Sequence, residues 1–254
     1  MSGWSILFWL IITFLILHPL NRWISSHVQG VVYLLTKSIN VSMWVFWVLF
    51  LPGTLLHELS HWLTAKFLLV RTGSFSVWPK MKQRGHLQMG AVEVDEVDVF
   101  RHSIIGLAPL IFGSIAVLII GQGRLQLGQF GLALLEGNVE AIWKALETTL
   151  SVPDVWLWLY LVFAISNAML PSASDRESWR TSLIYLGLAF VFVLALGINP
   201  TSSPEIQRVG LTILTYLLSA FIITITVDLF FIALIFFVEA IMAALLGRRV
   251  QYNR

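Results

Sequence analysis

The chain has 254 residues, of which 57% are hydrophobic and only 12% are charged, and its mean hydropathy is +0.83. A soluble domain carries roughly a quarter of charged residues, so this composition excludes an ordinary water-soluble globule. The net charge of +2 comes from Lys and Arg scattered between apolar segments, which argues against a nucleic-acid partner, and the absence of Cys excludes disulfides and Cys-based metal sites.

Apolar stretches long enough to be membrane-spanning helices recur along the chain, since about 20 residues of helix cross a bilayer. We predict about six spans, at 4–20, 41–69, 102–121, 152–170, 179–198 and 208–246. The predicted fold class is therefore an all-α polytopic membrane protein embedded in the lipid bilayer. If both termini are cytoplasmic, eleven of the 16 Lys and Arg lie on the inner side, which agrees with the positive-inside rule.

Two connections between the predicted spans are long enough to hold structure of their own. Residues 71–101 contain Gly and Pro breakers around short β-type stretches at 75–78 and 87–99, which predicts a hairpin or small sheet with bulges. Residues 122–151 interleave Leu and Trp with charged residues. That pattern is typical of a helix lying on the membrane surface, here the outer one.

The second predicted span contains the motif H-E-x-x-H, from His57 through Glu58 to His61. Residues four apart share one face of a helix, so two imidazoles can converge on one metal ion while Glu58 reaches a metal-bound water. Ionisable residues inside a membrane cost about 2.5–3.5 kcal/mol each, so three within five residues need a compensating role. We predict a Zn²⁺ site with His57 and His61 as ligands and Glu58 as the general base. The alternative is that these are polar residues at the interfacial end of a helix.

A catalytic zinc takes three protein ligands and a water, so the motif leaves one ligand to be found. Asn167 lies roughly 22 Å into the fourth span and His57 roughly 24 Å into the second, and both spans run in the same direction. Pro171 should end the helix after Asn167, and a turn could then bring Asp175 back to the metal. The other candidates near a membrane segment are His18, His27, His86, His102, Asp228 and Glu239.

This series of residues, His57 to His61 followed by Asn167, Pro171 and Asp175, resembles the site-2 protease family of intramembrane zinc metalloproteases. The resemblance covers roughly residues 41–180. It implies that the H-E-x-x-H helix supplies two zinc ligands and the base, that Asp175 supplies the third ligand, and that Asn167 contacts the substrate backbone.

The family also places a membrane-associated β-hairpin after the zinc helix, where residues 71–101 lie, and the small-residue stretch 106–109 resembles its next span. The chain departs from the family at Arg176, where a Gly usually follows the ligand Asp. An ion pair between Arg176 and Asp175 within a loop is therefore the alternative to metal binding by Asp175.

The leading hypothesis is an intramembrane zinc metalloprotease that hydrolyses peptide bonds of single-span membrane protein substrates. The alternatives are a zinc peptidase acting on surface or soluble peptides, and a non-catalytic scaffold or transporter. We expect a multi-pass protein of a prokaryotic cell membrane, with the active site near the cytoplasmic side. The chain then divides into an N-terminal helix with an outer linker (1–40), a catalytic membrane core (41–180) and C-terminal transmembrane helices (181–254).

Overall fold

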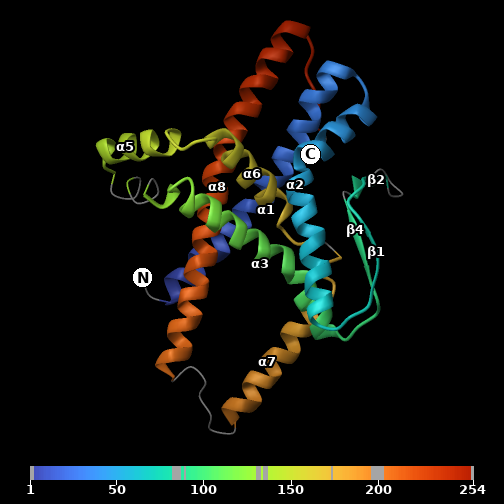
Figure 1. The fold of residues 1–254 in the computed structure, drawn as a ribbon, viewed down its shortest axis with the longest axis vertical. Helices are drawn as coiled ribbons and strands as arrows, with labels where there is room; N and C mark the ends of the chain where they lie inside the picture. The colour runs from blue at the N-terminus through green and yellow to red at the C-terminus, as the bar shows by residue number, and fades with distance from the viewer. Residues whose placement is uncertain are drawn as a thin grey trace.

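The computed structural model describes residues 3–81, 87–88, 90–129, 133, 137–172, 174–195 and 203–252 (Figure 1). The helices are α1 (Gly3–Thr36), α2 (Ile39–Phe67), α3 (Val99–Gly123), α5 (Val139–Leu150), α6 (Val155–Ala168), α7 (Trp179–Ala195) and α8 (Pro204–Leu246). The strands are β1 (Thr72–Ser76), β2 (Lys80–Met81), β3 (Leu87–Gln88) and β4 (Ala91–Val94).

Among the described residues, four helices are long and apolar enough to cross a membrane, namely α1, α2, α3 and α8. A fifth crossing results if α5 and α6, which are bent by 97° at a short break, count as one span. The chain is therefore mostly helical and compatible with a membrane protein, but the described residues do not confirm the predicted number of about six spans. The described part of α6 has 14 residues and that of α7 has 17, fewer than the roughly 20 that a bilayer requires.

The first helix is much longer than the predicted span at 4–20, because α1 continues to Thr36. Only two residues separate it from α2, so most of the outer linker predicted in 1–40 is helix. The polar residues after position 20 do not end the helix because they find partners: the Asn21 amide donates to α6, and the Ser26 hydroxyl donates to the Arg22 carbonyl.

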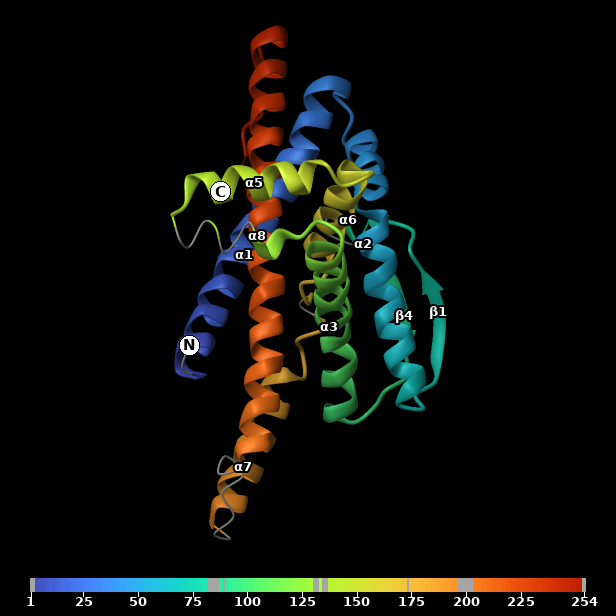
Figure 2. The same ribbon diagram turned by 60° about the vertical axis from the view of Figure 1, so that its left-hand side comes forward.

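The direction of α1 and α8 corrects the predicted topology. Near their N-terminal ends Gly3 lies against Leu211, and near their C-terminal ends His27 faces Glu239. The two helices are therefore parallel, as Figure 2 shows. If both cross the membrane, their N-terminal ends share one side, which disagrees with the prediction that both chain termini are cytoplasmic.

Helices α2 and α6 pack side by side in the same direction, as predicted. The Tyr160 hydroxyl donates to the Leu49 carbonyl at 2.9 Å, and His57 bonds to the Ala168 carbonyl, each pair being 111 residues apart in the sequence. Buried aromatic rings of α2, α6 and α8 fill the space between these helices, with Phe50 and Phe231 both contacting Phe163. This packing sets the depth at which the histidine motif meets the end of α6.

The predicted β region between α2 and α3 is confirmed in outline. β1 pairs antiparallel with β4, with a register shift between Thr72 and Phe75, and β2 pairs antiparallel with β3. The predicted strand at 87–99 is wrong at its end, because β4 stops at Val94 and Asp98 caps α3. The Asp98 carboxylate accepts from the N–H groups of Phe100 and Arg101, a helix start that ends the extended backbone.

Within the predicted surface segment 122–151, α5 runs at a steep angle to α8 (Figure 2) and extends to one side of the long helices (Figure 1). Its charged side chains Glu140, Lys144 and Glu147 are exposed, whereas Ala145 and Thr149 are buried. The Thr149 hydroxyl donates to the Leu125 carbonyl oxygen, which ties the end of α5 to the segment after α3. The position of α5 at a membrane surface stays a prediction, and residues 130–132 and 134–136 lie outside the described part of the chain.

Candidate metal centre

The two histidines of the H-E-x-x-H motif converge with Asp175 at one point. His57 and His61 lie one turn apart on α2, and their Nε2 atoms are 3.1 Å apart. The Asp175 carboxylate completes the group, with 3.6 Å between Oδ2 and His57 Nε2 and 3.3 Å between Oδ1 and His61 Nε2. One candidate ligand atom from each of the three residues falls within 4.8 Å of the others, so the group can hold a metal ion.

Backbone carbonyls fix the orientation of both imidazole rings. The His57 Nδ1 atom bonds to the Ala168 carbonyl oxygen at 2.7 Å, and the His61 Nδ1 atom bonds to the Ile105 carbonyl oxygen at 2.8 Å. A carbonyl oxygen only accepts hydrogen bonds, so Nδ1 carries the proton in each ring and donates it. In the neutral form of each ring, Nε2 then has a lone pair for a metal, as in known metal-binding histidines. Without a metal, a proton on Nε2 is donated to the Asp175 carboxylate, and metal binding releases it.

A tight turn after α6 brings Asp175 to the histidines. The Ser172 N–H donates to Asp175 Oδ2 at 2.7 Å, and the Asp175 N–H donates to the Ser172 hydroxyl at 3.3 Å. The Arg176 guanidinium instead donates to the Ser172 carbonyl oxygen at 3.2 Å. Within the described residues, the ion-pair partners of Asp175 are the two histidines, so the alternative pairing with Arg176 is not formed.

The neighbours of Asp175 favour its charged form. The residue lies between α6 and α7, outside the spanning helices. Burial of the carboxyl raises its pKa, but hydrogen bonds from His57, His61 and Ser172 outweigh this effect and hold the pKa well below the ordinary value of 3.8. Asp175 is therefore an ionised carboxylate, the form that binds a metal.

Glycine in α3 allows the Asp175 turn to approach. The backbone of Gly106 lies so close to the Asp175 carbonyl that a Cβ atom there would overlap the carbonyl oxygen. Because Gly106 is next to Ile105, which holds His61, one turn of α3 supports two of the three candidate ligands.

The β region meets the centre at Glu58. This residue lies between the two histidines on α2 and is only 7% exposed. Gly90, directly before β4, packs against it so closely that a Cβ atom at position 90 would lie 2.6 Å from Glu58 Oε1. The start of β4 and the predicted general base therefore face each other.

Asn167 occupies the predicted depth, but its side chain is bonded to other helices. Its amide nitrogen donates to the Phe163 carbonyl oxygen at 2.9 Å and to Asp228 Oδ1 at 2.8 Å. Its amide oxygen accepts from Asn21 at 3.2 Å. The predicted contact of Asn167 with a substrate stays a prediction, and it requires one of these partners to be exchanged.

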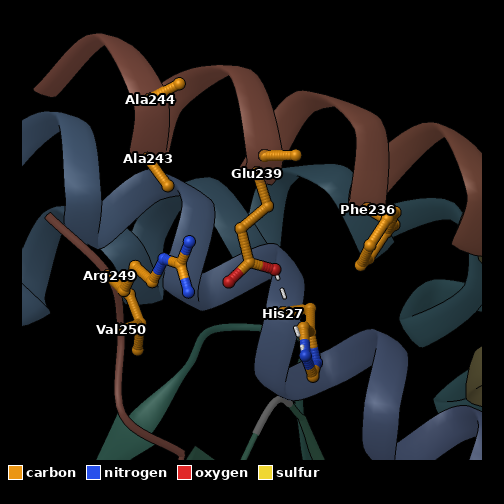
Figure 3. Close-up of a pocket in the computed structure, with 8 residues that line it drawn as sticks. His27, Phe236, Glu239, Ala243, Ala244, Arg249 and Val250 are labelled. Atoms are coloured by element: carbon orange, nitrogen blue, oxygen red, sulfur yellow. Dashed lines mark ion pairs between the residues drawn. The ribbon is translucent and has the colours of Figure 1, made fainter. Parts of the chain in front are cut away.

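Two of the other candidate ligands, His27 and Glu239, line a separate pocket between α1 and α8 (Figure 3). The His27 ring stacks on Trp23 at 3.8 Å and on Tyr252 at 4.1 Å between ring centroids. The Tyr252 hydroxyl donates to Glu239 Oε1 at 2.7 Å, and His27 Nε2 lies 4.0 Å from Glu239 Oε2. This pair does not take part in the metal centre.

The remaining candidate ligands either lie away from the metal centre or fall outside the described residues. His102 Nδ1 is 2.8 Å from the Ser178 hydroxyl, which itself bonds to Ser103, so it links α3 to the start of α7. His18 is exposed on α1, and His86 lies outside the described residues. Asp228 contacts Asn167 instead of the histidines.

Sequence reasoning missed the backbone groups that orient the ligands. The carbonyls of Ile105 and Ala168 leave no signal in the residue types, because any residue supplies a carbonyl. Glycines inside apolar helices, Gly106 in α3 and Gly53 in α2, are the available signals of a close backbone approach.

No described protein family, no curated protein and no solved structure matches the chain. The resemblance to the site-2 protease family therefore depends on the motif residues themselves.

Proposed function

We propose that the chain is an intramembrane zinc metalloprotease that hydrolyses peptide bonds of membrane-spanning substrates. The observation that carries the proposal is the convergence of His57, His61 and Asp175, with both histidine rings oriented by backbone carbonyls. Two neutral imidazole nitrogens and one carboxylate oxygen are the donor set of many catalytic zinc sites, in which water takes the fourth position.

The residues around the centre suit hydrolysis of an amide bond. His57, His61 and Asp175 would hold a zinc ion, which would supply Lewis-acid chemistry for activating water and polarising the substrate carbonyl. Glu58, which is buried beside the two histidines, accepts the proton of the attacking water and delivers it to the leaving amine nitrogen. The C–N bond breaks, and the products are one carboxylate and one amine.

A substrate helix hides its carbonyls in its own hydrogen bonds, so cleavage requires an extended segment. Within the described residues β4 pairs only with β1, which leaves its second edge without a strand partner. β4 begins beside Gly90, which packs on Glu58. In this proposal an unwound substrate segment pairs with the edge of β4 and extends toward Glu58, by β-strand addition.

The long apolar helices are compatible with a membrane protein. The kind of membrane, the side on which the active site lies and the substrates are part of our proposal. We place the active site near the cytoplasmic side of a prokaryotic cell membrane, with single-span membrane proteins as substrates. The parallel arrangement of α1 and α8 then requires that only one of the chain termini faces the cytoplasm.

Replacing Glu58 by Gln tests the mechanism, because the amide keeps the shape of the side chain but cannot accept the proton. We expect cleavage of a fluorogenic single-span substrate in detergent to fall by at least about 10²–10⁴-fold, the range of general acid–base catalysis, while zinc content is unchanged. Glu140→Gln on the exposed face of α5 is the matched control and should cleave like the wild type.

Cleavage by Glu58→Gln at the wild-type rate would exclude the proposed role of this residue. A chelator should abolish wild-type cleavage, and added Zn²⁺ should restore it. A soluble peptide with the same cleavage sequence separates the two peptidase hypotheses: equal rates on both substrates favour an enzyme acting on surface or soluble peptides.

A further inference from the structure

The end of α6 beside the metal centre is held by a polar cluster of Asn21, Asn167 and Asp228, which come from α1, α6 and α8; Asp228 is buried and the two asparagines are partly buried. The Asn21 side-chain amide donates to the backbone carbonyl oxygen of Asn167 at 2.5 Å and to its amide oxygen at 3.2 Å. The Asn167 amide nitrogen in turn donates to Asp228 at 2.8 Å. Asn167 of α6 is thus hydrogen-bonded to α1 through Asn21 and to α8 through Asp228.

Burying the Asp228 carboxyl at this position costs free energy. Asp228 is 1% exposed and lies in α8, the most apolar of the four candidate spanning helices, where an acidic side chain is costly and is a functional candidate by default. The hydrolysis described above does not use it. Its bond to Asn167 therefore needs an explanation beyond packing.

The carbonyl groups at the end of α6 connect the cluster to the metal centre. The last four carbonyls of a helix have no partner within the helix, and α6 ends at Ala168. Of these carbonyls, that of Asn167 accepts from Asn21, and that of Ala168 accepts from His57 Nδ1. The residue fixed by α1 and α8 directly precedes the residue that orients a candidate metal ligand.

We propose that Asn21 and Asp228 are positioning residues for His57. They act through Asn167 to fix the last turn of α6, so that the Ala168 carbonyl holds the His57 ring with Nε2 toward the metal. The inference rests on the proposed function only in that the centre binds zinc, and it does not require proteolysis. It also gives Asn167 a role in this chain that is distinct from contact with a substrate.

A set of matched variants separates positioning from packing. Asp228→Leu removes the acceptor for Asn167, whereas Asp228→Asn keeps an oxygen that can accept the same bond. Asn21→Ala removes the donor to the Asn167 carbonyl oxygen and to the Asn167 amide oxygen. Thr224→Val is the control, because Thr224 is one turn before Asp228, is also 1% exposed, and its hydroxyl has no hydrogen-bond partner among the described residues.

The measurement is zinc affinity of the full chain in detergent, by competition with a chelator at a temperature where each variant is folded. We expect Asp228→Leu and Asn21→Ala to bind zinc about 10–100-fold more weakly, the usual effect of losing an outer partner of a metal ligand. Asp228→Asn and Thr224→Val should stay close to the wild type. Unchanged zinc affinity in Asn21→Ala, or equal losses in Asp228→Asn and Asp228→Leu, would overturn the proposal.

The outcome is distinguishable from failure of the proposed function. A chain that binds zinc without cleaving substrate refutes the proteolytic function and leaves this test intact. If the wild type binds no zinc, the tautomer of His57 in the metal-free protein tests the proposal instead. The tautomer is measured from the ¹⁵N chemical shifts of labelled histidine, and His57→Gln assigns the His57 signals. We expect the Nδ1–H form in the wild type and a tautomer mixture in Asn21→Ala, and identical spectra for the two would overturn the proposal.

Discussion

Two regions of the molecule place a histidine beside an acidic residue, and within the described residues only one of them gathers three candidate metal ligands. At the metal centre, His57, His61 and Asp175 present their ligand atoms within 4.8 Å of one another. In the pocket between α1 and α8, a single histidine, His27, lies 4.0 Å from Glu239. The second pair is stabilised by other means, since Tyr252 both stacks on the His27 ring and donates to Glu239.

The difference shows that orientation decides the chemistry more than residue type does. Both Nδ1 atoms at the metal centre are bonded to backbone carbonyls of neighbouring helices, so both Nε2 atoms turn inward. His27 Nδ1 bonds to the Trp23 carbonyl of its own helix, and no second histidine faces it within the described residues. The first arrangement joins α2, α3 and α6, whereas the second fastens the C-terminal segment to α1.

The largest effect is expected from removing one ligand in each region. His61→Ala should lose zinc and cleavage together, with a fall in zinc affinity well beyond the roughly 10–100-fold expected for an outer residue. His27→Ala should retain both. Metal analysis of the purified proteins is the measurement, and equal zinc loss in both variants would remove the distinction between the two regions.

The carboxylates sharpen the same comparison. Asp175→Ala should lower zinc affinity strongly, whereas Glu239→Gln should not change it, and chelator competition measures both.

The low pKa of Asp175 also makes the stability of the folded chain depend on pH. A carboxyl whose pKa is held below 3.8 stabilises the folded state above about pH 3.8, and this contribution disappears as the pH falls through the lowered value. Wild-type stability should therefore drop more steeply with acid below pH 3.8 than that of Asp175→Ala.

A smaller effect is expected from replacing Gly106, whose lack of a side chain allows the Asp175 turn to approach α3. In Gly106→Ala the new methyl group meets the Asp175 carbonyl, so we expect a loss of about 1–3 kcal/mol in stability, as for other overpacked sites, and weaker zinc binding. Gly123→Ala at the end of the same helix meets nothing within 4 Å and should not destabilise the protein. Thermal unfolding with and without zinc makes the comparison, and equal behaviour of the two variants would contradict it.

The smallest effect belongs to the pocket between α1 and α8. Tyr252→Phe keeps the ring on His27 but loses the bond to Glu239, which should cost about 0.5–1.5 kcal/mol and leave zinc affinity unchanged. Burial and the bond to Glu239 raise the pKa of Tyr252 above its ordinary value of 10.0, so its contribution is present below pH 10 and is lost as the pH rises further. Denaturant unfolding of the wild type and Tyr252→Phe at pH 8 and above pH 10 measures the loss in stability and its pH dependence. A change in zinc affinity in Tyr252→Phe would contradict the independence of this pocket from the metal centre.

Much of the fold was predictable because its signals are local. Long apolar runs identify α2, α3 and α8, and the breakers after α2 identify the β region. The length of α1 was not predictable from hydropathy, because its second half mixes polar residues with apolar ones such as Ile24, Val28 and Leu34, which are buried only in the folded chain. The direction of α8 relative to α1 was also mispredicted, since it depends on the number of crossings and on packing between segments about 200 residues apart.

The sequence by itself determined the chemistry that is available. The spacing of His57, Glu58 and His61 places two imidazoles and a carboxylate on adjoining positions of one helix, and this follows from helical periodicity alone. Only the tertiary structure decided which acid joins them and how the rings turn. The approach of Asp175 depends on the turn at Ser172 and on contact with Gly106, and ring orientation depends on carbonyls at Ile105 and Ala168. Long-range packing sets these contacts, and backbone carbonyls have no signature in the residue types, so beyond glycines such as Gly106 the sequence alone carried no readable signal for them.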